Sequence, residues 1–207
     1  MRPLNILLAA AGILAGAAGL HATTVVPPEF PELVQGSDYI IRGKVTALRN
    51  EIRWRDGREV PFTQVEIQVA EVIAGTPPAQ VVLTMLGGRT SDGGVLTVDG
   101  VPQFQVGDQD ILFVQGNGTN FHPLRAVMHG RYPVRFDKKL GREYVARANG
   151  VPLAATAEVA LPLAEGKLAQ LLRRQRRADD ALTPSEFIQS IREVRAARAQ
   201  GGKSHAN

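Results

Sequence analysis

Two pairs of side chains in this chain have types and spacings that suit acid–base or metal chemistry. Asp108 and Asp110 are two residues apart, so in a strand they would share a face as paired carboxylates do. Because they follow a glycine turn and begin an apolar segment, we interpret them as turn and edge residues. His122 and His129 are seven residues apart, which in one continuous strand places them on opposite faces. The sequence has no HExxH motif, and we predict no metal site and no cofactor.

The glycine-rich segment Gly87–Gly94 is a second place where an active site could lie. It carries a hydroxyl and a carboxylate in Ser91 and Asp92. It lacks the spacing and the lysine of a phosphate-binding loop, and no histidine lies near Ser91 in the sequence to act as a base. The chain also has no G-x-S-x-G motif. We therefore predict a loop without catalytic residues, and an enzyme with an unrecognised polar site near this segment is the alternative.

The only tryptophan of the chain, Trp54, lies between two arginines, Arg53 and Arg55. Trp and Arg are the residue types most enriched at the energetic centres of protein interfaces. We predict that Arg53, Trp54 and Arg55 form a partner-binding site on a charged loop spanning Asn50–Gly57. The alternative is that Trp54 folds back on the body of the protein.

Short segments of alternating apolar and polar residues, separated by Gly, Asp and Asn turns, predict a mainly β fold. A first strand alternates from Tyr39 to Val45, and a second alternates from Val65 until its phase slips at Ala70, as it does at a β-bulge. Residues 111–114 are continuously apolar, which indicates a central strand buried on both sides. We predict a small antiparallel OB-like barrel. We expect one core to contain Ile41, Val65, Ile67, Val69, Leu83, Ile111 and Phe113.

Helices are expected after this barrel. Thr183, Pro184 and Glu186 are typical of a helix N-terminus, and the apolar stripe of Phe187, Ile191 and Val194 should dock on the barrel or on a partner. The predicted organisation is an export signal over residues 1–22, an extended Pro-rich lead-in over 23–36, the barrel over 37–148, a C-terminal helical appendage over 149–200 and a disordered tail over 201–207.

The N-terminal segment predicts where the protein works. Arg2 precedes an apolar run, Ile6–Leu20, that is shorter than the roughly 20 residues needed to span a bilayer. A small residue, Ala22, marks the expected cleavage site, so we predict a periplasmic or secreted protein. The chain has no cysteine, which excludes disulfides and thiol chemistry.

Charge is concentrated at the C-terminal end. Residues 167–207 contain nine Lys and Arg but four Asp and Glu, whereas residues 23–166 are slightly acidic. A basic region can contact an anionic membrane surface, and the alternative is a solvated helix face. Nucleic acid is not an expected partner of an exported protein.

Four sequence runs carry a resemblance to known proteins: SDYIIRGKVTAL, TQVEIQVAEVIAG, VVLTMLGG and GVLTVDGVPQFQVGDQDILFV. Together they resemble an uncharacterised family of bacterial exported proteins. More distantly, residues 37–128 are similar in layout to the netrin-like domain of tissue inhibitors of metalloproteinases, which implies an OB-type barrel. Those inhibitors chelate the target's metal through an N-terminal cysteine, which this chain lacks.

The expected function is therefore that of an exported, non-enzymatic binding module. Its expected partner is a protein, such as an envelope or extracellular hydrolase. A structural role in the cell envelope is a further alternative.

Overall fold

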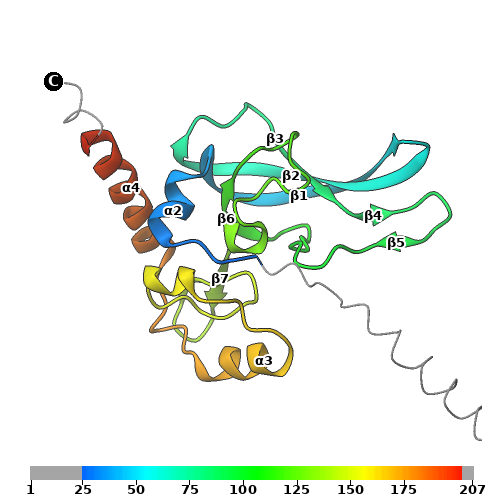
Figure 1. Ribbon diagram of the computed structural model, residues 1–207. Helices are drawn as coiled ribbons and strands as arrows, with labels where there is room; N and C mark the ends of the chain where they lie inside the picture. The colour runs from blue at the N-terminus through cyan, green and yellow to red at the C-terminus, as the bar shows by residue number, and fades with distance from the viewer. Residues whose placement is uncertain (1–24, 202–207) are drawn as a thin grey trace, which may run out of the picture.

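The computed structural model describes residues 25–201 as one six-stranded antiparallel sheet with helices against one face (Figure 1). The strand order is β3-β2-β1-β6-β7-β8, and β4 and β5 form a separate two-stranded sheet. None of the described helices is long and apolar enough to cross a membrane. The elements are α2 (Phe30–Gln35), β1 (Tyr39–Arg55), β2 (Arg58–Gly75), β3 (Val81–Leu86), β4 (Gly88–Arg89), β5 (Val95–Leu96), β6 (Gln109–Val114), η1 (Val127–Gly130), β7 (Arg131–Asp137), β8 (Arg142–Val145), η2 (Thr156–Ala160), α3 (Gly166–Gln175) and α4 (Pro184–Gly201).

The predicted mainly β class, with antiparallel strands and C-terminal helices, is confirmed. The sheet is not closed into a barrel, because β3 and β8 lie at its two edges and do not pair with each other. The predicted export signal over residues 1–22 lies outside the described residues. Of the predicted tail over 201–207, only Gly201 is described, and it ends α4.

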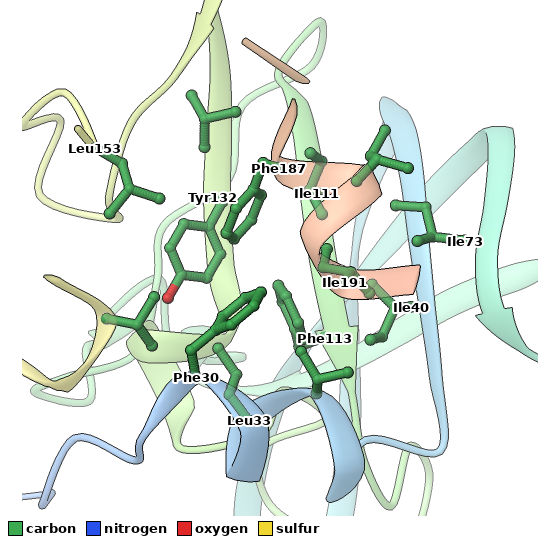
Figure 2. Close-up of a cluster of buried hydrophobic side chains, with 14 of the residues drawn as sticks. Phe30, Leu33, Ile40, Ile73, Ile111, Phe113, Tyr132, Leu153, Phe187 and Ile191 are labelled. Atoms are coloured by element: carbon green, nitrogen blue, oxygen red, sulfur yellow. The ribbon is translucent and has the colours of Figure 1, made fainter. Parts of the chain in front are cut away.

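The first core lies between the sheet and the helices α2 and α4 (Figure 2). Four aromatic rings meet there: the ring centroids of Tyr132 and Phe187 are 4.9 Å apart, those of Phe113 and Tyr132 are 5.5 Å apart, and those of Phe30 and Phe187 are 5.6 Å apart. Phe187 and Ile191 are fully buried, so the predicted docking of the α4 stripe on the sheet is confirmed.

The second core lies on the opposite face of the sheet and is covered by the chain around Val101 and Phe104. Strand β6 is buried from Asp110 to Val114, so the central strand predicted from the apolar run 111–114 is confirmed. The expectation that Ile111 and Phe113 share a core with Ile41 is wrong. Successive side chains of a strand point to opposite faces, so a strand buried on both sides supplies both cores. Ile111 and Phe113 belong to the first core, while Leu112 and Val114 join Ile41 in the second.

Irregular pairing bends the two long strands. The register between β1 and β2 shifts between Arg42 and Gly43, whose partners are Glu71 and Val69, so Ala70 is the extra residue. The β-bulge predicted at Ala70 is confirmed. Gly43 is needed here because a Cβ at that position would lie 2.5 Å from Cγ2 of Ile67.

A short helix, α2, occupies part of the segment that we expected to be an extended lead-in over 23–36. Pro31 is the second helical residue, where a missing N–H costs nothing. The side chain of Glu32 bonds back to the backbone of Glu29, which starts the helix. Leu33 and Val34 are fully buried, and this burial holds the helix on the sheet.

Candidate functional site

The strands β1 and β2 continue beyond the rest of the sheet as a two-stranded hairpin. β6 accompanies β1 only as far as Lys44, whereas β1 pairs with β2 up to Arg55 and Arg58. The turn between them is Asp56–Gly57, with φ values of 50° and 73°. Two successive residues with positive φ are typical of the tight hairpin turn that Asp-Gly favours. The hairpin projects to one side of the molecule in Figure 1.

The predicted loop over Asn50–Gly57 is therefore wrong, because Trp54 and both arginines belong to strand β1. Side chains alternate between the faces of a strand, so Trp54 lies on one face of the hairpin while Arg53 and Arg55 lie on the other. Trp54 is 70% exposed and does not fold back on the body of the protein.

The Trp54 face continues inwards as an apolar surface. Leu48 and Ile52 lie on the same side of β1 and are each more than a third exposed. Towards the sheet this surface leads into a cavity of about 190 Å³ between the hairpin and the β4–β5 segment. We call this cavity the apolar groove, and it exceeds the roughly 150 Å³ that accommodates a benzene-sized group. The main apolar side chains lining it are Leu48, Val65, Met85, Val98, Val101 and Phe104.

The opposite face of the hairpin carries the two arginines. The guanidinium carbon of Arg53 lies 4.7 Å from the ring centroid of Phe62, and that of Arg55 lies 5.5 Å from the ring centroid of Phe121. Arg53 also pairs with Glu51 at 2.7 Å, and this hydrogen bond lowers the pKa of the Glu51 carboxyl, with a further contribution from Gln64.

Arg55 forms no ion pair within residues 25–201. Both arginines line a polar pocket of about 100 Å³, which also contains Thr119, Asn120 and Phe121. We call it the arginine pocket. Because Arg53 is already bonded to Glu51, Arg55 is the guanidinium group of this pocket that can donate to a carboxylate or another anion.

The two carboxylates Asp108 and Asp110 form a buried ion-pair cluster with Arg131 of β7. A terminal nitrogen of Arg131 lies 2.7 Å from Asp108, and Nε lies 2.8 Å from Oδ1 of Asp110. Asp108 caps the turn at Gln105, as predicted for a turn residue. Asp110 is not an edge residue, because it lies in the central strand β6 and is 1% exposed. Burial raises the pKa of Asp110, and Arg131 opposes that rise.

This cluster positions the wall of the apolar groove. Arg131 donates to the carbonyl of Gln103, and its guanidinium carbon lies 4.1 Å from the ring centroid of Phe104. Both of these residues line the apolar groove. The cluster is occupied by its own contacts, so it orders the groove and does not supply free catalytic carboxylates.

The segment Gly87–Gly94 lies across the β1–β2 hairpin and is held there by hydrogen bonds to both strands. The backbone of Arg89 exchanges hydrogen bonds with the side chain of Asn50, and Ser91 donates both its N–H and its hydroxyl to Glu59. No histidine contacts Ser91 among the bonds of the described chain. Neither the apolar groove nor the arginine pocket is lined by Arg89, Asp108 or His122.

The two histidines lie between β6 and β7 and share no strand, because His122 is in a loop and His129 is in η1. His129, in η1, is 6% exposed, and burial followed by the charge of Arg147 lowers its pKa to about 4. Within residues 25–201 no group of three His, Cys, Asp or Glu side chains could hold a metal ion.

Many of the basic residues near the C-terminus contact the body of the fold. Arg176 pairs with Glu158, and Arg192 pairs with Glu71, both at 2.6 Å. Arg195 donates to the backbone carbonyl of Ser37. Part of the basic excess therefore anchors α3 and α4, and contact with an anionic membrane stays a prediction.

Comparison of the chain with protein-family models found no match, and comparison with curated proteins found none either. Sequence reasoning missed Phe62 and Phe121, which lie under the arginines, and it missed the groove. The dipeptide Asp56-Gly57 was the available signal for a hairpin, and strand alternation then separates Trp54 from its two neighbours.

Proposed function

We propose that this protein is an exported binding module that recognises another protein through the end of the β1–β2 hairpin, with Trp54 as its anchor. The observation that carries this proposal is the 70% exposure of Trp54 on a structured strand that projects from the sheet. A large aromatic side chain on a rigid element can be buried by a partner at a small entropic cost.

Both faces of the hairpin support recognition. Ile52 and Leu48 extend the apolar surface beside Trp54, and the apolar groove has room for one apolar side chain of the partner. On the other face, Arg55 is available to an acidic group. An apolar centre with charged surroundings is the usual anatomy of a protein interface.

Binding is favoured over turnover because the candidate catalytic groups are separated or occupied. Ser91 is bonded to Glu59, and Asp108 and Asp110 are bonded to Arg131. The Gly87–Gly94 segment instead lies across the hairpin, and its first two residues, Gly87 and Gly88, line the groove.

Affinity capture with two matched variants tests the proposal. Trp54→Ala and Phe136→Ala each remove an exposed aromatic side chain, and Phe136, 61% exposed in β7, lies outside the hairpin. A protein captured from the producing organism's extracytoplasmic fraction should bind Trp54→Ala at least about fivefold more weakly and Phe136→Ala unchanged. Equal binding to all three proteins, or capture of nothing, contradicts the proposal.

Export is part of the proposed function and has a separate test. We propose cleavage after Ala22, on the basis of the charged start and the short apolar run. N-terminal sequencing of the protein from the periplasm or medium should begin at Thr23. An intact Met1 on protein recovered from the cytoplasm contradicts this part of the proposal.

A further inference from the structure

One edge of β1 carries no strand. β2 pairs with β1 along its whole length, but β6 pairs with the other edge only from Tyr39 to Lys44. Val45 then bonds to the backbones of Gly107 and Asp108. Beyond Val45, no backbone bond joins this edge of β1 to any other described segment.

The orientation of the free backbone groups follows from the pairing of Ile52 with Pro61. Gly87 donates its N–H to the carbonyl of Pro61 at 2.9 Å, so the backbone of Pro61 points towards β3. Ile52 and Pro61 are therefore a non-hydrogen-bonded antiparallel pair, in which the backbone polar groups of each residue point away from the other strand. The N–H and C=O of Ile52 therefore face outwards, as do those of the residues two and four positions away. The outward-facing residues are Leu48, Asn50, Ile52 and Trp54.

The two terminal edges of the sheet are covered, in contrast to this one. The side chain of Asn117 accepts from the N–H of Thr84 and donates to the carbonyl of Val82, both on the outer edge of β3. On the outer edge of β8, Val145 donates to Leu182 and accepts from Leu153. A free edge of this length is a template for pairing with another chain.

The side chains along the free edge define what would pair with it. On one face the edge carries the apolar side chains of Leu48, Ile52 and Trp54, together with Asn50, whose amide is bonded to the backbone of Arg89. On the other face β1 carries Arg49, Arg53 and Arg55 against Glu51. Arg49 is paired with Glu66 and Arg53 with Glu51, whereas Arg55 forms no ion pair in the described part of the chain. An added strand places its own side chains beside these, alternately on the two faces. Apolar residues alternating with acidic ones therefore complement the edge.

A second copy of this chain is a poorer complement. Each copy carries three arginines against one glutamate on this stretch. Antiparallel pairing of two β1 edges centred on Ile52 would set Glu51 opposite Arg53 but Arg49 opposite Arg55, and centring on Glu51 would set Arg49 opposite Arg53. Like charges directly opposite each other destabilise a sheet. The same charges that attract an acidic strand thus discourage pairing between copies.

We propose that the partner contributes an extended segment, in which acidic residues alternate with apolar ones, as an added strand along Leu48–Trp54 of β1. This inference rests on the proposed function, because it states how the partner meets the hairpin. Main-chain hydrogen bonds to the free edge provide the affinity, and the two faces of β1 select the side chains.

A synthetic peptide tests this mode of binding directly. The probe is a peptide of about seven residues, matched to the length of the free edge, in which Glu alternates with Ile. It is titrated into the mature protein, and the fluorescence of Trp54, the only tryptophan of the chain, reports binding. We expect a saturable change. Replacing Glu by Lys in the peptide, or methylating its central backbone nitrogens, should weaken binding about tenfold or more.

A matched pair of protein variants tests the edge itself. Ile52→Pro removes the outward N–H without removing a bond to β2, and proline is tolerated on sheet edges. Ile52→Val keeps the N–H. Ile52→Val therefore measures the effect of the altered side chain alone, and the peptide should bind Ile52→Pro at least about tenfold more weakly than it binds Ile52→Val. The methylated peptide keeps the test valid if Ile52→Pro does not fold.

The inference is overturned by no saturable change with the Glu peptide, by equal binding of the methylated peptide, or by a dimer in sedimentation that Ile52→Pro dissociates. The last would make a second copy the occupant. If Trp54→Ala no longer binds the natural partner but Ile52→Pro still does, recognition through Trp54 is supported and strand addition is contradicted. If no natural partner depends on Trp54, the proposed function itself falls.

Discussion

Arg131 of β7 donates two hydrogen bonds to the carboxylate of Asp110 in β6, from Nε to Oδ1 at 2.8 Å and from a terminal nitrogen to Oδ2 at 3.2 Å. Both side chains are almost completely buried. The same guanidinium also reaches Asp108 and Gln103. Through these contacts one residue joins two sheet strands to the wall of the apolar groove. Removing one partner of a buried charged pair is strongly destabilising, because the other charge then stays buried without compensation.

Replacing Arg131 by Met should therefore destabilise the protein by about 3–5 kcal/mol, because Asp110 would stay buried without a countercharge. The free energy of unfolding in urea measures the effect. Arg192→Met is the matched control, since it breaks the half-exposed pair with Glu71, and it should cost no more than about 1 kcal/mol. Similar losses in the two variants would contradict the role given to Arg131.

The aromatic core predicts a second contrast. Phe113 is fully buried, and its ring centroid lies 5.5 Å from that of Tyr132 and 6.1 Å from that of Phe187. Phe113→Ala should cost about 3–5 kcal/mol of unfolding free energy, because it leaves a cavity beneath α4. Phe136→Ala, at an exposed site in β7, should cost less than about 1 kcal/mol. A loss below that value for Phe113→Ala would mean that the α4 face of the sheet is not the core.

The buried His129 predicts a loss of stability in acid. Its pKa is about 4 in the folded protein, below the ordinary value of 6.5, because burial and then Arg147 disfavour its charged form. The unfolded chain thus binds more protons between these values, so stability falls as the pH drops from about 6.5 to about 4, by up to roughly 3 kcal/mol.

Urea unfolding of the unaltered protein and of His129→Gln at pH 7 and at pH 4.5 isolates this effect, since the carboxylates titrate in both proteins. The unaltered protein should lose more stability between the two pH values than the variant does. An equal loss in both would show that His129 is not protected from protonation by the fold.

Local sequence patterns predicted much of the sheet. The apolar run 111–114 correctly indicated a central strand, and the phase slip at Ala70 correctly indicated a bulge. Both are properties of a single strand. The separation of Ile111 and Phe113 from the core of Ile41 was missed, because it depends on α2 and α4 covering one face and the chain around Phe104 covering the other.

The candidate site shows the same limit. The sequence predicted that Trp54 and its neighbouring arginines form a partner-binding site. It did not show that Trp54 lies on one face of a projecting hairpin and the two arginines on the other. Phe121 is 66 positions beyond Arg55 and reaches it only through the loop after β6. Three prolines suggested an extended lead-in, yet α2 forms there because burial of Leu33 and Val34 outweighs weak local propensity.

The central claim is that Trp54 contacts the partner, and site-specific photo-crosslinking tests it most directly. A benzophenone amino acid is placed at position 54 in one protein and at position 136, an equally aromatic and exposed site on β7, in the other. Irradiation of producing cells should give one discrete crosslinked protein from position 54 and none of that species from position 136. The same product from both positions, or no product from position 54, would contradict recognition through the hairpin.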